Sequence, residues 1–332
     1  MKKAVLLVVS VFLLSIMLAG CGGKSQQTGD AGKAKESFPT GPIEYVVHTN
    51  PGDGADIAAR TIADIAVKKN IVSQPVNVVN KVGGSGSAMF SYVATKKGNG
   101  HFIMPMQVSG LTTPLRTKTE VTYKDFTPIA LMTKDELVIA VKAESQFKSM
   151  KDLVAAAKKG EKSVSQGGGV LGGSDSILSF LIEKSAGVKF NYITFKGGGE
   201  AVVALLGGNC DFIAMNPAEV EAQVEAGKMR LLAVASSKRL EKHPNVPTLK
   251  EEGVDVVLQS FRGVAAPKDI SGDAKKYLEE AMKKVAETDE FKAYCKQNSV
   301  TLEYMNSADF AKYLDQQNEM FTAVYKDMGL LK

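Results

Sequence analysis

The stretch Ile43–Lys69, IEYVVHTNPGDGADIAARTIADIAVKK, predicts a strand, a glycine-rich turn and a helix in succession. Its first five residues are apolar, β-branched or aromatic except for Glu44, which is typical of a strand. The glycines of residues 51–56, PGDGAD, then indicate a turn. Apolar residues recur at helical spacing after that turn, at Ala58, Ile62, Ile65 and Ala66.

The same alternation of short apolar runs and helical segments continues as far as Ala235. Such βαβ repetition favours parallel sheets with helices on both faces. The continuous apolar run Leu137–Val141 is typical of a buried parallel strand, and a second set of alternating segments follows it. Two successive sets predict two lobes. The remaining segment, Ser271–Lys332, is expected to be nearly all helical.

The N-terminus has the organisation of an export signal. Lys2 and Lys3 precede an apolar run, Ala4–Met17, which ends in the lipobox-like sequence Leu18-Ala19-Gly20-Cys21. We therefore predict a signal peptide over residues 1–20, a lipid on Cys21, and a flexible Gly/Ser/Gln/Lys-rich tether over 21–38. A transmembrane helix with a chance cysteine is the alternative, but the run is shorter than the roughly 20 residues that a span needs.

Net charge and the number and spacing of histidines and cysteines argue against several classes of function. The formal net charge is only +5 and basic residues are dispersed, so nucleic-acid binding is not expected. The three histidines stand at no metal-ligand spacing, and we predict neither a metal nor a cofactor. Cys210 and Cys295 are expected to be separate thiols, with a single disulfide left as the alternative.

Glycine accumulates where the predicted strands end. Backbone amides in such turns approach a ligand closely, and a helix that begins there adds unpaired N–H groups. Each turn alone could be a simple cap, but several facing one cleft would bind an anion without arginine. The turns lie at residues 51–56, 83–87, 166–175, 197–199 and 216–217.

Enzyme motifs are weak. Gly167–Gly172 fits the dinucleotide pattern G-x-G-x-x-G, but the next strand ends in Phe195-Lys196-Gly197 without the expected acid. No P-loop and no G-x-S-x-G nucleophile elbow is present in the sequence. We expect a binding protein rather than an enzyme, with an exported enzyme acting on an organic acid, or a dinucleotide-binding one, as the alternative.

From about Ile43 to Leu330 the sequence resembles the substrate-binding proteins of tripartite tricarboxylate transporters. The resemblance rests on the combination of stretches rather than on any one of them. These stretches are Pro51–Asp56 with Ala59-Arg60, Gln74–Val76, Asn80–Gly86, Phe195–Ala201, Gly227–Val234, Pro244–Leu249 and Arg262–Pro267.

The resemblance implies a two-lobe, type II periplasmic-binding-protein-like clamshell with two mainly parallel sheets flanked by helices. Lobe 1 would comprise residues 39–142 plus 264–332 and lobe 2 residues 143–263, with hinge segments at the two crossovers, near Val141–Glu144 and Phe261–Ala265. A small organic carboxylate would bind between the lobes, and the closed monomer would dock on multi-span membrane transporter subunits. A sensor subunit that presents the ligand to a signalling partner is the further alternative.

The implied ligand contacts are backbone amides and short polar side chains of both lobes. In lobe 1 they are Pro51, Gly52, Asp53, Gly54, Asp56, Ser85 and Gly86. In lobe 2 they are Gln166, Gly168, Gly172, Gly173, Ser174, Asp175 and Asn216.

Three positions depart from the family pattern. Ser176 follows Asp175 where many members have histidine, and Phe261 stands where tryptophan is frequent. Asp53 replaces a glycine and would repel a bound anion if it faced the ligand. It either points to solvent or caps the following helix, or it meets a cationic or hydroxyl group of the ligand.

Overall fold

The computed structural model describes residues 38–331 except 118, 170 and 196. The described residues belong to one compact unit, Ser37–Lys332. The predicted signal peptide, Cys21 and nearly all of the tether lie outside the described residues. Within the described part of the chain, no helix combines the length and apolarity needed to cross a membrane.

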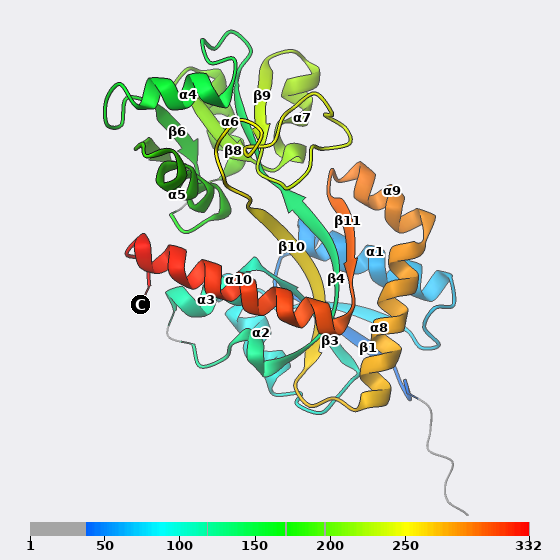
Figure 1. Ribbon diagram of the computed structural model, residues 1–332. Helices are drawn as coiled ribbons and strands as arrows, with labels where there is room; N and C mark the ends of the chain where they lie inside the picture. The colour runs from blue at the N-terminus through cyan, green and yellow to red at the C-terminus, as the bar shows by residue number, and fades with distance from the viewer. Residues whose placement is uncertain (1–37, 118, 170, 196, 332) are drawn as a thin grey trace, which may run out of the picture. The chain divides into compact units, whose positions relative to one another are not determined.

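The first sheet has six strands in the order β11-β4-β10-β3-β1-β2 (Figure 1). β1, β2 and β3 run parallel to one another, whereas β10 is antiparallel to both β3 and β4, and β11 is antiparallel to β4. The strands are β1 (Ile43–Val47), β2 (Val76–Asn80), β3 (Phe102–Gln107), β4 (Phe126–Glu136), β10 (Gln259–Pro267) and β11 (Thr301–Met305).

Helices cover both faces of this sheet. α1 (Gly54–Lys68), α8 (Gly272–Glu287) and α9 (Asp289–Gln297) share one buried cluster with the sheet. The other face packs against α2 (Ser87–Ala94), α3 (Val108–Arg116) and α10 (Ser307–Asp327). Two short 3-10 turns, η1 (Gly84–Gly86) and η2 (Tyr123–Asp125), connect these elements.

The second sheet has five strands in the order β7-β6-β8-β5-β9. The strands are β5 (Val138–Lys142), β6 (Ser165–Gly168), β7 (Asn191–Thr194), β8 (Phe212–Met215) and β9 (Met229–Val234). Its helices are α4 (Met150–Ala157), α5 (Ser174–Ala186), α6 (Gly198–Leu206) and α7 (Pro217–Glu225). α6 and α7 share a core cluster with β5, β8 and β9, and α4 and α5 lie in the large cluster that also contains α10.

The two-sheet α/β prediction is confirmed, but the sheets are mixed rather than mainly parallel. β6 pairs in parallel with β7 and β8, whereas β5 is antiparallel to β8 and β9. The chain leaves the first sheet through β4 and returns through β10, so these neighbours must run in opposite directions. An apolar run such as Leu137–Val141 shows that a strand is buried but not which way its neighbours point.

By sheet membership the chain changes sheets at Leu137, between β4 and β5, and again between β9 and β10. β5 therefore belongs to the second sheet, although the predicted lobe boundary at Lys142 counted it with lobe 1. All of β10 belongs to the first sheet, on both sides of the boundary predicted after Gly263. The extent of each lobe stays a prediction.

The prediction that the C-terminal segment is nearly all helical is wrong at one place. Thr301–Met305 forms β11, which pairs with β4 at the edge of the first sheet. Its five residues lie between α9 and α10 and are too few for a clear period-2 pattern. The last helix, α10, buries one apolar face, on which Phe310, Leu314 and Phe321 are fully buried.

Cys210 and Cys295 are both free and buried, as separate thiols. Cys210 packs in the core of the second sheet and Cys295 in that of the first. Burial raises the pKa of Cys210 to about 11 and that of Cys295 to about 12.

Candidate functional site

The helices that follow the glycine turns begin without side-chain caps. In the described part of the chain, α1, α2, α5, α6 and α7 have no side-chain hydrogen bond at their N-caps, and neither does α3. By contrast, side chains cap α4, α8, α9 and α10, and the capping residues are Ser149, Ser271, Thr288 and Asn306.

The uncapped helices gather at two sheet edges. α1, α2 and α3 follow the parallel strands β1, β2 and β3, and α5, α6 and α7 follow the parallel strands β6, β7 and β8. Carboxyl ends of parallel strands share an edge, which is where open α/β sheets bind ligands. First-turn N–H groups without a cap are donors for an anion. In α5 one of them, the amide of Ser176, already donates a 2.9 Å hydrogen bond to Asp175 Oδ1.

Asp56 holds the first predicted loop in place. Its carboxylate is buried and accepts hydrogen bonds from the Gly52 amide, Arg60 Nε and Asn80 Nδ2, each at 2.9 Å. The Arg60 hydrogen bond, against the opposing effect of burial, lowers the pKa of Asp56 to about 2, and the Gly52 and Asn80 bonds act in the same direction. Both carboxylate oxygens thus accept hydrogen bonds from protein groups, and Asp56 stabilises the turn rather than capping α1.

Asp53 is the exposed N-cap residue of α1. Its side chain forms no cap and instead accepts a hydrogen bond of 3.0 Å from the amide of Asn50. Pro51, Gly52 and Gly54 are exposed around it. Of the alternatives for the Asp53 side chain, capping of α1 is therefore not observed, and its exposure agrees with the alternative in which it points to solvent.

An ion pair between strands β10 and β4 lies against this loop. Arg262 in β10 contacts one carboxylate oxygen of Asp135 in β4 through Nε and Nη2, with the Nε distance 2.8 Å. A Cβ added at Gly54 would lie 3.2 Å from Arg262 Nη1, so glycine lets the loop rest close to the guanidinium. The burial of Arg262 opposes its charged form, but Asp135 outweighs this and raises the pKa of Arg262.

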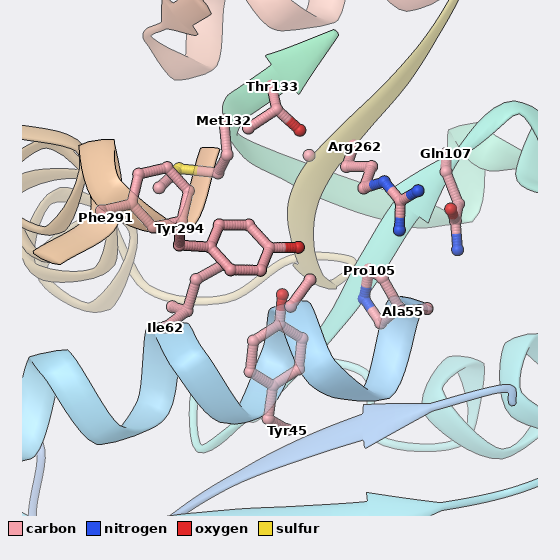
Figure 2. Close-up of a pocket in the computed structure, with 12 residues that line it drawn as sticks. Tyr45, Ala55, Ile62, Pro105, Gln107, Met132, Thr133, Arg262, Phe291 and Tyr294 are labelled. Atoms are coloured by element: carbon pink, nitrogen blue, oxygen red, sulfur yellow. The ribbon is translucent and has the colours of Figure 1, made fainter. Parts of the chain in front are cut away.

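Figure 2 shows the small cavity beside this pair, with Arg262 and Gln107 on one side and the hydroxyls of Tyr45 and Tyr294 facing the interior. Ala55 of α1 also contributes to its wall. Its volume is about 20 Å³, which is room for about one water molecule. The cavity is too small for an organic acid. We therefore assign it to the packing between the loop and the Arg262–Asp135 pair, not to the ligand site.

Ser85 and Gly86 form the second turn of the first sheet. Ser85 is exposed and adopts the left-handed region at φ 53°, and its carbonyl accepts a 3.0 Å hydrogen bond from Thr113 Oγ1 in α3. Gly86 has φ 98° and is buried against Phe90 and His48. Burial, and then the charge of Arg262, lower the pKa of His48, which favours its neutral form beside this turn.

The second-sheet loop is organised by Asp175. One of its carboxylate oxygens accepts hydrogen bonds from the Gly169 amide and from the Tyr192 hydroxyl, the latter at 2.9 Å. A Cβ at Gly168 would lie 2.2 Å from that hydroxyl and 2.6 Å from the carboxylate, so only glycine fits. Gln166 is fully buried and donates to the Asp175 carbonyl at 3.3 Å. Gln166, Gly168 and Asp175 thus shape the loop from inside.

Gly172, Gly173 and Ser174 lead into α5. Gly172 adopts φ 86°, and its amide donates to Ser176 Oγ at 2.9 Å. Ser176 therefore fixes the turn, at the position where the family resemblance led us to expect histidine. The Gly172 carbonyl accepts a 2.7 Å hydrogen bond from Tyr325 of α10. Gly173 is the N-cap of α5, and Ser174 is its half-buried first residue.

Asn216, in the turn after β8, connects the second sheet to the crossover between β4 and β5. Its Nδ2 donates a 2.9 Å hydrogen bond to the carbonyl oxygen of Glu136, the last residue of β4. Asn216 also stands at the N-cap of α7, with Pro217 as the first helical residue. The site residues that sequence analysis missed are Thr113, Asp135, Tyr192, Arg262 and Tyr325, which reach the loops from distant elements and carry no local motif.

The fold places the chain among two-sheet periplasmic solute-binding proteins. A TctC solute-binding protein from Polaromonas superposes with a TM-score of 0.81 and 30% identity, covering 88% of this chain and 100% of that one. A Rhodopseudomonas palustris protein solved with adipate has a TM-score of 0.72 at 23% identity, over 88% and 99% of the two chains, and shares the fold.

The family follows from the sequence comparisons. The sequence model of the tripartite tricarboxylate transporter family receptor, TctC, matches residues 58–330. A Cupriavidus necator protein, described as a UPF0065 protein in the gbd 5′ region, is 31% identical over 90% of each chain. This chain therefore belongs to the tripartite tricarboxylate transporter receptor family.

Proposed function

We propose that this protein is an extracytoplasmic, lipid-anchored receptor that captures a small organic carboxylate between its two lobes and delivers it to the membrane subunits of a tripartite tricarboxylate-type transporter. The observation that carries the proposal is the set of uncapped helix N-termini at the two strand edges. Their N–H groups suit carboxylate oxygens, and helices elsewhere in the described chain have side-chain caps.

The predicted site residues divide into two groups under this proposal. Amides at the starts of α1 and α5, together with Ser85, Gly86 and Asn216, would meet the ligand. The carboxylates of Asp56 and Asp175 would act indirectly, since protein donors already occupy them. The adipate found with the Rhodopseudomonas palustris protein supports an organic acid as the ligand class.

A dinucleotide-binding role for Gly167–Gly172 has less support. In dinucleotide folds the loop amides bind the pyrophosphate, whereas here Asp175 occupies the Gly169 amide. A Cβ at Gly167 would lie 2.8 Å from Cys210 Sγ, so this glycine serves packing within the lobe. We therefore propose binding without catalysis.

Titration calorimetry of the purified protein against mono-, di- and tricarboxylates tests the ligand class. We expect one or more acids to bind with a one-to-one stoichiometry, and dinucleotides to give no heat. An absence of binding by every organic anion would remove the proposal. Transport assays with and without the membrane subunits of the proposed transporter separate delivery from sensing.

Lipid anchoring has its own test. Wild type and a Cys210→Ser control should incorporate labelled fatty acid, whereas the Cys21→Ser protein should not. If wild type incorporated no label but stayed in the membrane, an apolar span rather than a lipid would be the anchor.

A further inference from the structure

Arg116 differs from the other arginines of the chain. The sequence contains five arginines, and four have hydrogen-bond partners within the protein. These pairs are Arg60 with Asp56, Arg230 with the carbonyl oxygens of Ala143, Ser145 and Phe147, Arg239 with Glu251, and Arg262 with Asp135. Within the described residues, Arg116 forms no ion pair, and its Nε is buried without an acceptor. The Nε of Arg230 is buried without an acceptor as well, but Arg230 bonds through Nη1 and Nη2.

Arg116 lies between the two predicted binding loops. It is the last residue of α3, and Thr113 of the same helix bonds to the carbonyl of Ser85 in the first-sheet turn. On its other side is the second-sheet loop, because a Cβ added at Gly172 would lie 3.5 Å from Arg116 Cδ. Burial raises the pKa of Tyr325, which also contacts Gly172, and the positive charge of Arg116 acts against that shift.

A purely structural role does not account for this arrangement. The C-terminal end of a helix stabilises a nearby cation, and Arg116 benefits from that position in α3. The helix dipole nevertheless supplies no acceptor for the buried Nε. Burying part of a guanidinium without an acceptor is unfavourable. The terminal Nη1 and Nη2 groups of Arg116 are not among the buried unpaired atoms, so these are the donors that an arriving anion would meet.

We propose that Arg116 binds a second carboxylate group of the ligand, so that the protein prefers dicarboxylates to monocarboxylates of the same chain length. This inference rests on the proposed function. The uncapped helix starts would take one carboxylate through main-chain amides. The planar guanidinium would take the other, since its fork of donors matches two carboxylate oxygens.

The test compares matched acids on matched variants. Wild type, Arg116→Met and Arg239→Met are titrated with adipate and hexanoate and with succinate and butyrate. Arg239 is exposed and pairs with Glu251, so its variant removes an arginine away from the loops. We expect wild type and Arg239→Met to prefer the diacid of at least one pair. Arg116→Met should lose about 10–100-fold in affinity for that diacid and stay within about threefold for the monoacid.

Equal loss for both acids in Arg116→Met, or no loss for the diacid, would overturn the role of Arg116 while leaving the proposed function intact. If wild type binds none of these acids or any other organic anion, the proposed function itself fails. Thermal unfolding checks that each variant folds. Should Arg116→Met unfold, Arg116→Lys takes its place, with charge retained but the fork lost, and an unchanged diacid preference in that variant would count against the inference.

Discussion

The hydroxyl of Tyr325 donates a 2.7 Å hydrogen bond to the carbonyl oxygen of Gly172. Tyr325 belongs to α10, which packs on the first sheet, and Gly172 belongs to the glycine loop of the second sheet. Both residues are buried, and an exposed ion pair of 2.7 Å joins Lys184 of α5, the helix that follows this loop, to Asp327 of α10. The C-terminal helix therefore helps to set the conformation of a loop that we propose to bind ligand.

Replacing Tyr325 with Phe should destabilise the protein by about 1–3 kcal/mol, because the buried Gly172 carbonyl loses its partner. Carboxylate binding should weaken as well, since the loop loses a restraint. Urea denaturation and calorimetry measure the two effects. Tyr123→Phe is the control, because its hydroxyl bonds to Asp315 at 2.7 Å on the surface. Equal effects in the two variants would show that the hydrogen bond to Gly172 contributes no more to stability or affinity than an exposed hydrogen bond does.

Asp56→Ala should lower stability by about 1–3 kcal/mol and weaken ligand binding, although Asp56 is not proposed to touch the ligand. The carboxylate is buried and accepts three hydrogen bonds that hold the turn before α1. Asp64→Ala on the same helix is the matched control, because its pair with Lys68 is exposed and should contribute under about 0.5 kcal/mol. Normal affinity in Asp56→Ala would separate this turn from the binding site.

The same carboxylate predicts a pH dependence. Its folded pKa is lowered to about 2, below the ordinary value of an aspartate. The stabilisation is therefore fully present above about pH 4 and is lost as the pH falls towards 2. Wild type should lose more stability than Asp56→Ala between pH 4 and 2, as measured by urea denaturation at each pH. Parallel curves for the two proteins would contradict this.

Local patterns predicted local structure well. The strand, turn and helix of Ile43–Lys69 are present as β1, a glycine turn and α1, because residue type and periodicity act over a few neighbours. Strand direction was not predictable in the same way. It depends on the path of β4 and β10 between the two sheets, which joins residues far apart in the sequence.

In the candidate site too, local features were predictable from sequence and long-range contacts were not. The glycine turns could be found from sequence, since positions such as Gly172 adopt conformations that favour glycine. The roles of Asp56 and Asp175 could not, because Asn80 and Tyr192, which occupy their oxygens, come from other strands. Arg116 has no motif, and only the fold shows that its Nε is buried without an acceptor among the residues that the structure describes.

Gly168→Ala should destabilise the second-sheet loop. The new methyl would lie 2.2 Å from Tyr192 Oη and 2.6 Å from an Asp175 oxygen, so it must separate these hydrogen-bonded groups. Overpacking of this kind typically costs about 1–3 kcal/mol, and carboxylate affinity should fall with it. Urea denaturation and calorimetry measure both changes.

Gly199→Ala is the matched control for this substitution. Gly199 lies in α6, and a Cβ there meets nothing within 4 Å. The added methyl should leave stability unchanged or raise it by up to about 1 kcal/mol, since alanine favours a helix. If Gly168→Ala were as stable as Gly199→Ala, the packing around Asp175 would be looser than the structure indicates.

Asp53→Asn should tighten carboxylate binding. Asparagine keeps an oxygen for the Asn50 amide, so the turn is preserved while its negative charge disappears. At short range in water, one removed like charge is worth about 1 kcal/mol, or several-fold in affinity, and salt should reduce the gain. Calorimetry at low and high ionic strength measures this, with Asp64→Asn, which carries the same charge change on α1, expected to have little effect. Weaker binding in Asp53→Asn would instead mean that Asp53 accepts a hydrogen bond from a hydroxyl or cationic group of the ligand, and would narrow the ligand to acids that carry one.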